Sequence, residues 1–196
     1  MTVTIQPVTL DDYLSYSDGT DNRYELVNGA LVRMAQPKGR HGAIAEYLND
    51  IFRAEIKRLG YNWTAKQMAI ALQSPRGGRW DTARIPDVMV LSLAQWHALR
   101  DQEAIIRLNE PPPFLVVEVV SASTTTVDYR AKRVEYNVLN IPEYWIVDPL
   151  ESVITLLRPI DDLYEAQAFR GNDEIASATF PELPLTVEQI LAAEEA

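Results

Sequence analysis

The most constraining stretch of this chain is an apolar run from Phe114 to Val120 that holds a single acidic residue, Glu118. A run of this kind fits a buried strand. A carboxylate inside it is costly as an anion unless a cation, a metal or a proton compensates it. Asp87 follows a proline in an earlier apolar run, Ile85 to Leu91. Two carboxylates at the ends of neighbouring buried strands predict a divalent metal.

The length and composition indicate one globular domain spanning residues 1–196. Glu118 interrupts the longest apolar run far short of a membrane span, so no transmembrane helix is expected. The segment from Met1 to Ile5 lacks the basic region and apolar core of a secretion signal. We therefore expect a cytoplasmic protein with no membrane partner.

The absence of cysteine removes thiol nucleophiles, disulfides and Cys-ligated zinc from consideration. The two histidines, His41 and His97, are too few for a three-histidine metal site. Any metal must therefore be held mostly by oxygen, as magnesium and manganese are.

The net charge of −10 argues, taken alone, against a nucleic-acid partner. However, the acidity belongs to the last third of the chain, because residues 134–196 hold two basic residues against 13 acidic ones. Residues 1–133 are nearly neutral and could present a basic surface to phosphates. A scatter of solvated surface charges explains the basic residues of this front region equally well. The residues concerned are Arg33, Lys38, Arg40, Arg53, Lys57, Arg58, Lys66, Arg76, Arg79 and Arg84.

Local patterns predict an α/β domain built on a mixed sheet with helices on both faces. Asn28-Gly29 predicts a hairpin between residues 24–27 and 30–34. Helices are expected from Thr9 to about Tyr16, from Arg40 to Leu59 before Gly60, over residues 93–100, along an apolar stripe of Val127, Ala131, Val134 and Val138, and from Thr186. Further strands are expected over residues 63–72, 85–91, 114–120, 144–148, 153–157 and about 164–169.

Because side chains alternate along a strand, Glu118 and Val120 should face the same pocket. This arrangement resembles the PD-(D/E)XK nuclease superfamily, in which a Pro-Asp opens one strand and an acidic-x-Lys motif lies on the next. Pro86-Asp87 and Glu118 match the pattern, whereas Val120 stands in the place of the lysine. Lys132, on the helix after the strand and one turn from Asp128, could return an ammonium to the carboxylates.

From about Tyr24 to Pro149, the chain is similar to the Uma-type restriction endonucleases, a branch of that superfamily long known as a domain of unknown function. Ala122 and Asn140-Ile141 depart from the family pattern, away from any proposed ligand. The resemblance rests on Arg23 to Gly29, His41, Pro86-Asp87-Val88, Val117 to Thr124, Asp128, Lys132 and Ile141 to Pro149.

The resemblance implies a restriction-endonuclease-like fold with a core of about residues 23–158, an N-terminal β-hairpin and extra C-terminal strands. It implies a metal-dependent endonuclease acting on DNA, and symmetric cutting of a duplex would favour a homodimer. Asp87, Glu118 and the backbone carbonyl of Val119 would hold Mg²⁺ or Mn²⁺. Lys132 would position the attacking water or stabilise negative charge, with Glu25 and His41 as possible additional site residues.

Each of these residues also has a simpler interpretation. Asp87 could accept backbone hydrogen bonds at a strand end, and Glu118 could form a structural ion pair with Arg84 or Lys132. Lys132 could pair with Asp128 at the helix surface, and His41 could be a core or capping histidine rather than a phosphate contact.

Two other functions also remain open at the level of sequence. One is a catalytically inactive nuclease-fold module that binds DNA or a protein partner, which Val120 and the acidic C-terminal third favour. The other is a metal-dependent hydrolase of a small phosphoester.

Overall fold

The computed structural model describes residues 6–193, so the segment from Met1 to Ile5 considered above lies outside the described residues. The helical segments are α1 (Leu10–Leu14), α2 (Gly39–Leu59), α3 (Leu93–Ala98), the π-helical turn η1 (Val127–Lys132), α4 (Arg133–Val138) and α5 (Val187–Leu191). The strands are β1 (Tyr24–Val27), β2 (Ala30–Arg33), β3 (Trp63–Gln67), β4 (Ala71–Gln73), β5 (Ala83–Arg84), β6 (Val88–Ser92), β7 (Ile105–Ile106), β8 (Leu115–Val119), β9 (Tyr144–Asp148), β10 (Val153–Ile160) and β11 (Leu163–Phe169).

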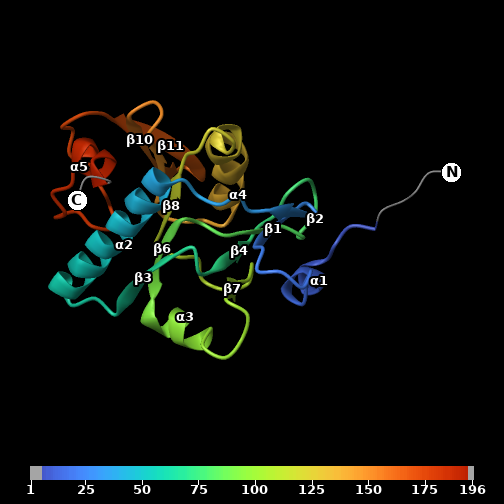
Figure 1. The fold of residues 1–196 in the computed structure, drawn as a ribbon. Coiled ribbons are helices and arrows are strands. Elements are labelled where there is room, and N and C mark those ends of the chain that lie inside the picture. The colour runs from blue at the N-terminus through green and yellow to red at the C-terminus, as the bar shows by residue number, and fades with distance from the viewer. Residues whose placement is uncertain (1–5, 194–196) are drawn as a thin grey trace.

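Within residues 6–193 the strands form two sheets, and the larger one places the candidate carboxylates (Figure 1). Its order is β11-β10-β9-β8-β6-β3, and the smaller sheet has the order β2-β1-β5-β4-β7. β8 pairs antiparallel with β6 and parallel with β9. Because Val88 pairs with Val117, the next position on each strand brings Asp87 opposite Glu118.

The two faces of β8 pack against different layers, which confirms the expected helices on both faces. Val117 and Val119 join the core beneath α2 and α5. Val116 and Val120 join a second core that includes Tyr136 of α4. The side chain of Glu118 therefore points toward the α4 side of the sheet.

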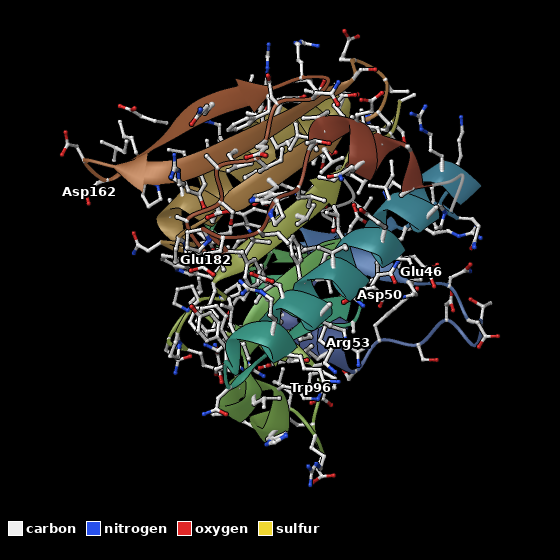
Figure 2. The ribbon with its side chains drawn as sticks, turned by 90° about the vertical axis from the view of Figure 1, so that its left-hand side faces the viewer. Glu46, Asp50, Arg53, Trp96, Asp162 and Glu182 are labelled. Carbon is white, nitrogen blue, oxygen red and sulfur yellow. The ribbon has the colours of Figure 1, made fainter. Side chains whose placement is uncertain are left out.

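The long helix α2 is amphipathic, as its sequence predicts. Ile44, Leu48 and Phe52 are fully buried against the sheet. Glu46, Asp50 and Arg53 lie on the outer face of the helix, in solvent (Figure 2). Gly60 ends the helix with a φ of 65°, a left-handed conformation that glycine adopts without strain.

The predicted hairpin is confirmed, because β1 and β2 pair across Asn28 and Gly29. Both turn residues have positive φ, 51° and 79°, as a two-residue type I′ turn requires. β1 also pairs with β5, and this contact brings Glu25 next to the segment that precedes Asp87.

Two predicted strands are wrong in extent, one because it is divided between the two sheets and the other because its first three residues lie outside any strand. The run 63–72 splits into β3 and β4 at Met68, which has a φ of 46° and donates its backbone N–H to the carbonyl of Asp87. In the run 85–91, only the residues from Val88 onward join a strand, β6, and Pro86 in the segment before it has no N–H to donate to a strand partner. Asp87 therefore lies where the chain passes from one sheet to the other.

The helix predicted along the valine stripe is present as η1 and α4, but the face it buries is the reverse of what the stripe indicates. Val134 and Val138 are 64% and 55% exposed, whereas Asp128, Lys132, Glu135 and Tyr136 are buried. The polar side chains can face inward because they bind one another and residues of the two sheets. A hydrophobic periodicity cannot show such mutual compensation.

The buried carboxylate of Glu143, just before β9, attaches the C-terminal segment to the sheet. Its Oε1 accepts hydrogen bonds from Trp145 Nε1 at 2.6 Å and Ser177 Oγ at 2.7 Å. Its Oε2 accepts from the backbone N–H groups of Ala178 and Thr179 at 2.7 and 2.9 Å. The Thr179 hydroxyl donates to Oε2 as well, at 3.3 Å, so five donors stabilise a carboxylate that is fully removed from water.

We expect Glu143→Gln to destabilise the protein by about 1–3 kcal/mol, because its amide turns one acceptor into a donor facing buried N–H groups. Urea unfolding monitored by circular dichroism measures this loss. Glu151→Gln, at an exposed turn residue, is the matched control. Equal midpoints for both variants would contradict this role of Glu143.

Candidate active site

Asp87 is held at the start of β6 by two contacts to the same oxygen. Its Oδ2 accepts the backbone N–H of Val119 at 2.7 Å and lies 3.2 Å from His41 Nε2. Its other oxygen, Oδ1, accepts no hydrogen bond from the described residues. The expected backbone hydrogen bond is therefore present, and Oδ1 remains available to a ligand.

Glu118 is only 2% exposed, and each of its carboxylate oxygens has a protein partner. Oε2 lies 2.7 Å from Lys132 Nζ, and Oε1 accepts a hydrogen bond from the Tyr136 hydroxyl at 2.6 Å. Lys132 Nζ also lies 3.1 Å from Asp128 Oδ1. The interpretation of Lys132 as a surface partner of Asp128 is therefore wrong, since both residues are buried and the ammonium reaches Glu118.

The π-helical turn explains why Asp128, Lys132 and Tyr136 share one face. Four residues exceed the 3.6-residue α-turn, so two such steps in a regular α-helix would rotate the third side chain by about 80° from the first. A π-turn holds more residues, so the step from Asp128 to Lys132 falls short of a full turn. The following α-helical step to Tyr136 offsets that lag.

The charges in this cluster shift one another's pKa values. Burial would lower the pKa of Lys132, but the carboxylates of Glu118, Glu25, Asp128 and Asp87 raise it above its ordinary value. Burial raises the pKa of Glu118 and that of Asp128, and Lys132 opposes both shifts. Lys132 is therefore a stable cation, and its charge compensates the apolar surroundings of Glu118.

His41 extends from the first turn of α2 to Asp87. Burial would lower its pKa, but the hydrogen bond and the charge of Asp87, with the backbone of Val119, raise it above 6.5. Its buried Nδ1 has no hydrogen-bond partner of good geometry among the described residues. His41 is thus a hydrogen-bonded, partly buried histidine, as one of its two simpler interpretations expects, and its partner is a candidate metal ligand.

Glu25 lies beside this cluster and is held by a separate network. Its Oε1 accepts the backbone N–H of Ile85 at 3.0 Å, and its Oε2 accepts from Arg84 at 2.9 Å. Arg84 also binds Glu135 of α4 through Nε and Nη2, at 2.8 and 3.0 Å. Arg84 therefore links the hairpin to α4, so its suggested pairing with Glu118 is wrong.

The residues present fit a magnesium-type ion. The described residues contain no group of three or more His, Asp or Glu side chains arranged to hold a metal. Magnesium, however, is usually held by one or two carboxylates with waters and substrate phosphates. The strand register places Asp87 opposite Glu118, Asp87 Oδ1 accepts no hydrogen bond from the described residues, and both oxygens of buried Asp128 lack a well-aligned hydrogen bond there. The three carboxylates thus supply the oxygen ligands that such an ion prefers.

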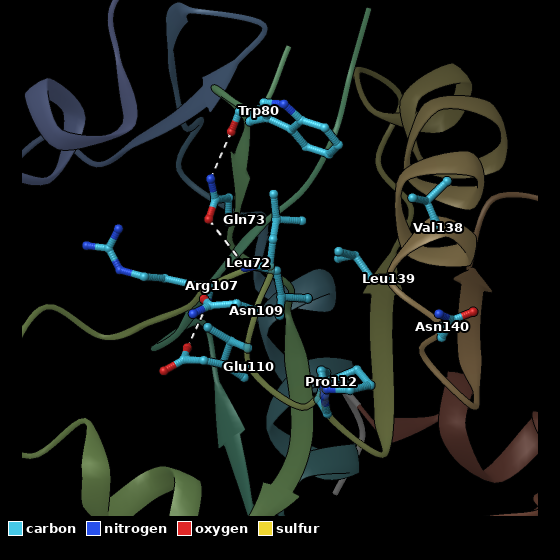
Figure 3. A pocket seen from close by; sticks show the side chains of 13 residues that line it. Leu72, Gln73, Trp80, Arg107, Asn109, Glu110, Pro112, Val138, Leu139 and Asn140 are labelled. Carbon is cyan, nitrogen blue, oxygen red and sulfur yellow. Dashed lines mark hydrogen bonds between the residues drawn. The ribbon is translucent and has the colours of Figure 1, made fainter. Parts of the chain in front are cut away.

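A separate pocket of about 540 Å³ lies between β4, residues 106–113 and the end of α4 (Figure 3). Trp80 and Pro112 lie on its rim, with Val138 and Leu139 on one side. Its one acidic wall residue among the described residues, Glu110, accepts the backbone N–H of Arg107. Asp87, Glu118 and Lys132 do not line it, so we place the candidate chemistry at the carboxylate cluster instead.

Sequence reasoning brought together Asp87, Glu118, Lys132 and His41, and the structure places these four side chains in one cluster. It gave no site role to Tyr136 or Asp128. The available signal was the spacing of four between Asp128, Lys132 and Tyr136. This spacing places the three side chains on one face of a helix, but the competing apolar stripe of Val127, Ala131, Val134 and Val138 indicated the other face as the buried one.

Comparisons with known proteins agree with this geometry. The family model described as "Uma2: Putative restriction endonuclease" matches residues 10–188. A solved structure of a "putative nuclease belonging to DUF820" from Anabaena variabilis ATCC 29413 is 19% identical, with a TM-score of 0.76 over 96% of this chain and 99% of that chain. This likeness confirms the expected fold. No curated protein is significantly similar to the chain.

We expect the metal-free protein to lose stability as the pH rises from about 6.5. The pKa of His41 is raised in the fold, so its protonated pairing with Asp87 contributes fully below the unfolded pKa and is lost as pH rises through the folded pKa. Thermal unfolding in EDTA from pH 5.5 to 9 measures this. His41→Gln should flatten the profile, whereas His97→Gln at an exposed position should not. Identical profiles for the two variants would refute the assignment.

Proposed function

The chain belongs to the Uma2 family, and from that premise we propose that it is a metal-dependent endonuclease that hydrolyses phosphodiester bonds in DNA. The observation that carries this proposal is the position of Glu118. It lies in a buried cluster, on a strand paired with the strand that follows Asp87, and its Oε2 is 2.7 Å from the Lys132 ammonium. Carboxylates beside a fixed cation are the groups that phosphodiester hydrolysis needs.

We assign the cation site to Asp87 and Glu118, with the backbone carbonyl of Val119 as a further candidate oxygen. A bound Mg²⁺ or Mn²⁺ would polarise the phosphate and acidify the attacking water. Lys132 stays protonated, so its role is to orient the water or stabilise developing negative charge rather than to accept a proton. The imidazole of His41, 3.2 Å from Oδ2 of Asp87, helps to hold that carboxylate in place.

The proposed DNA-binding region includes the start of α2, next to Asp87. The helix has no acidic residue in its first turn and no side-chain cap, and Lys38 is exposed there. This arrangement favours an anion. Four basic residues of the front region are instead bound to carboxylates, so only part of the suggested basic surface faces phosphates. These are Arg58, Arg76, Arg79 and Arg84.

A homodimer remains part of the proposal, because cutting both strands at a symmetric site is simplest with two copies related by a two-fold axis. Among the described residues, no helix is long and apolar enough to cross a membrane.

The second candidate is a nuclease-fold module that binds without cutting. The ion pair of Lys132 with Glu118 favours it, since this pair already compensates the buried charge without a metal. Metal binding separates the two candidates, because only the enzyme requires an ion at Asp87 and Glu118.

We expect the protein to nick plasmid or duplex DNA in Mg²⁺ or Mn²⁺, and EDTA to stop the reaction. Asp87→Asn, Glu118→Gln and Lys132→Met should each lower the rate about 100-fold or more, since each removes a charge at the reacting phosphate. Gel assays over short duplex, single-stranded and branched substrates measure the rates.

The matched control is Asp162→Asn, which removes a carboxylate from the exposed β10–β11 turn (Figure 2). It should cut at the wild-type rate. The endonuclease proposal would be refuted if folded Asp87→Asn, Glu118→Gln and Lys132→Met cut as fast as the wild type. It would also be refuted if the wild type were inactive on every substrate.

A further inference from the structure

The orientation of Glu118 depends on side chains of one helix. Its two carboxylate oxygens meet Lys132 Nζ at 2.7 Å and the Tyr136 hydroxyl at 2.6 Å. Lys132 is charged and has a second carboxylate partner in Asp128. The phenol is neutral, and Glu118 is its hydrogen-bond acceptor. The two contacts therefore differ in what a bound cation would do to them.

Tyr136 is itself firmly held. The residue is fully buried, and its ring meets that of Tyr144 edge to face, with centroids 5.0 Å apart and planes at 86°. The Tyr144 hydroxyl donates to the backbone carbonyl of Asp128, inside the π-helical turn. The packed ring leaves the Tyr136 hydroxyl no space to move away, so it fixes Oε1 of Glu118 from a rigid support.

We propose that Tyr136 is a positioning residue of the candidate metal site, whose hydroxyl holds Oε1 of Glu118 so that Oε2 is presented to a cation. This inference rests on the proposed function. The cation that contacts Oε2 in this structure is the Lys132 ammonium. When a divalent ion binds, Lys132 can move on its flexible stem, whereas the hydroxyl of Tyr136 keeps Glu118 in the same orientation.

A hydrogen-bond partner of a metal ligand typically changes metal affinity by about 10- to 100-fold when removed. Tyr136→Phe keeps the ring and its contact with Tyr144 but removes the hydroxyl. We expect this variant to bind Mn²⁺ at least about tenfold more weakly than the wild type, as measured by isothermal titration calorimetry on the full chain. The measurement does not depend on DNA cleavage.

The matched control is Tyr164→Phe. Tyr164 is also buried, and its hydroxyl also makes a 2.7 Å hydrogen bond, but to the backbone carbonyl of Ile141 and not to a carboxylate. A merely structural role for Tyr136 predicts that the two variants bind Mn²⁺ equally, and that result would overturn the inference. Weaker binding by Tyr136→Phe alone supports it.

A second measurement covers the case in which Tyr136→Phe does not fold. In the wild-type protein the buried Tyr136 hydroxyl proton should give a resolved, slowly exchanging NMR signal that persists in saturating Mg²⁺. Its disappearance on adding Mg²⁺ would overturn the inference. If the wild type does not bind Mn²⁺, or if Glu118→Gln leaves its Mn²⁺ binding unchanged, the proposed metal site itself is refuted, and the inference with it.

Discussion

The contact between Lys132 and Glu118 is the interaction on which the arrangement of this domain depends. A carboxylate in the central strand of the sheet, 2% exposed, is tolerated because an ammonium lies 2.7 Å away and a phenol binds its second oxygen. Removing one partner of such a pair typically costs about 3–5 kcal/mol, whereas an apolar replacement of the whole pair can be neutral. Stability alone therefore does not require this pair, and a functional role gives it a physical reason.

The same contact determines how the helical segment formed by η1 and α4 is oriented. A π-turn followed by an α-turn brings Asp128, Lys132 and Tyr136 into line on the face toward the sheet, and π-turns are frequent at functional sites. The consequence is that Val134 and Val138 face solvent. The helix thus buries its charged side and exposes an apolar one, which lowers hydrophobic stabilisation in exchange for a compensated ionic cluster.

The sequence predicted the parts of the fold that depend on local chemistry. Asn28-Gly29 and Gly60 supply positive φ angles that fix a hairpin and a helix end, and the alternation around Glu118 fixes which way it points. Proximity of Asp87, Glu118 and Lys132 followed from the family resemblance. The division of the run 63–72 between the two sheets at Met68, and the late start of β6 after Pro86, were not predictable, because apolar runs do not show which sheet a residue joins. The roles of Tyr136 and Asp128 depend on the π-turn, which leaves no clear mark in the sequence.

A crystal structure of the protein soaked in Mn²⁺ tests the central claim most directly, because manganese gives an anomalous signal at its own position. We predict an anomalous peak bound by oxygens of both Asp87 and Glu118, with the Lys132 ammonium moved from its contact with Oε2. A map without such a peak at saturating Mn²⁺, and with the 2.7 Å contact between Lys132 and Glu118 intact, would contradict the claim that this cluster is a metal site.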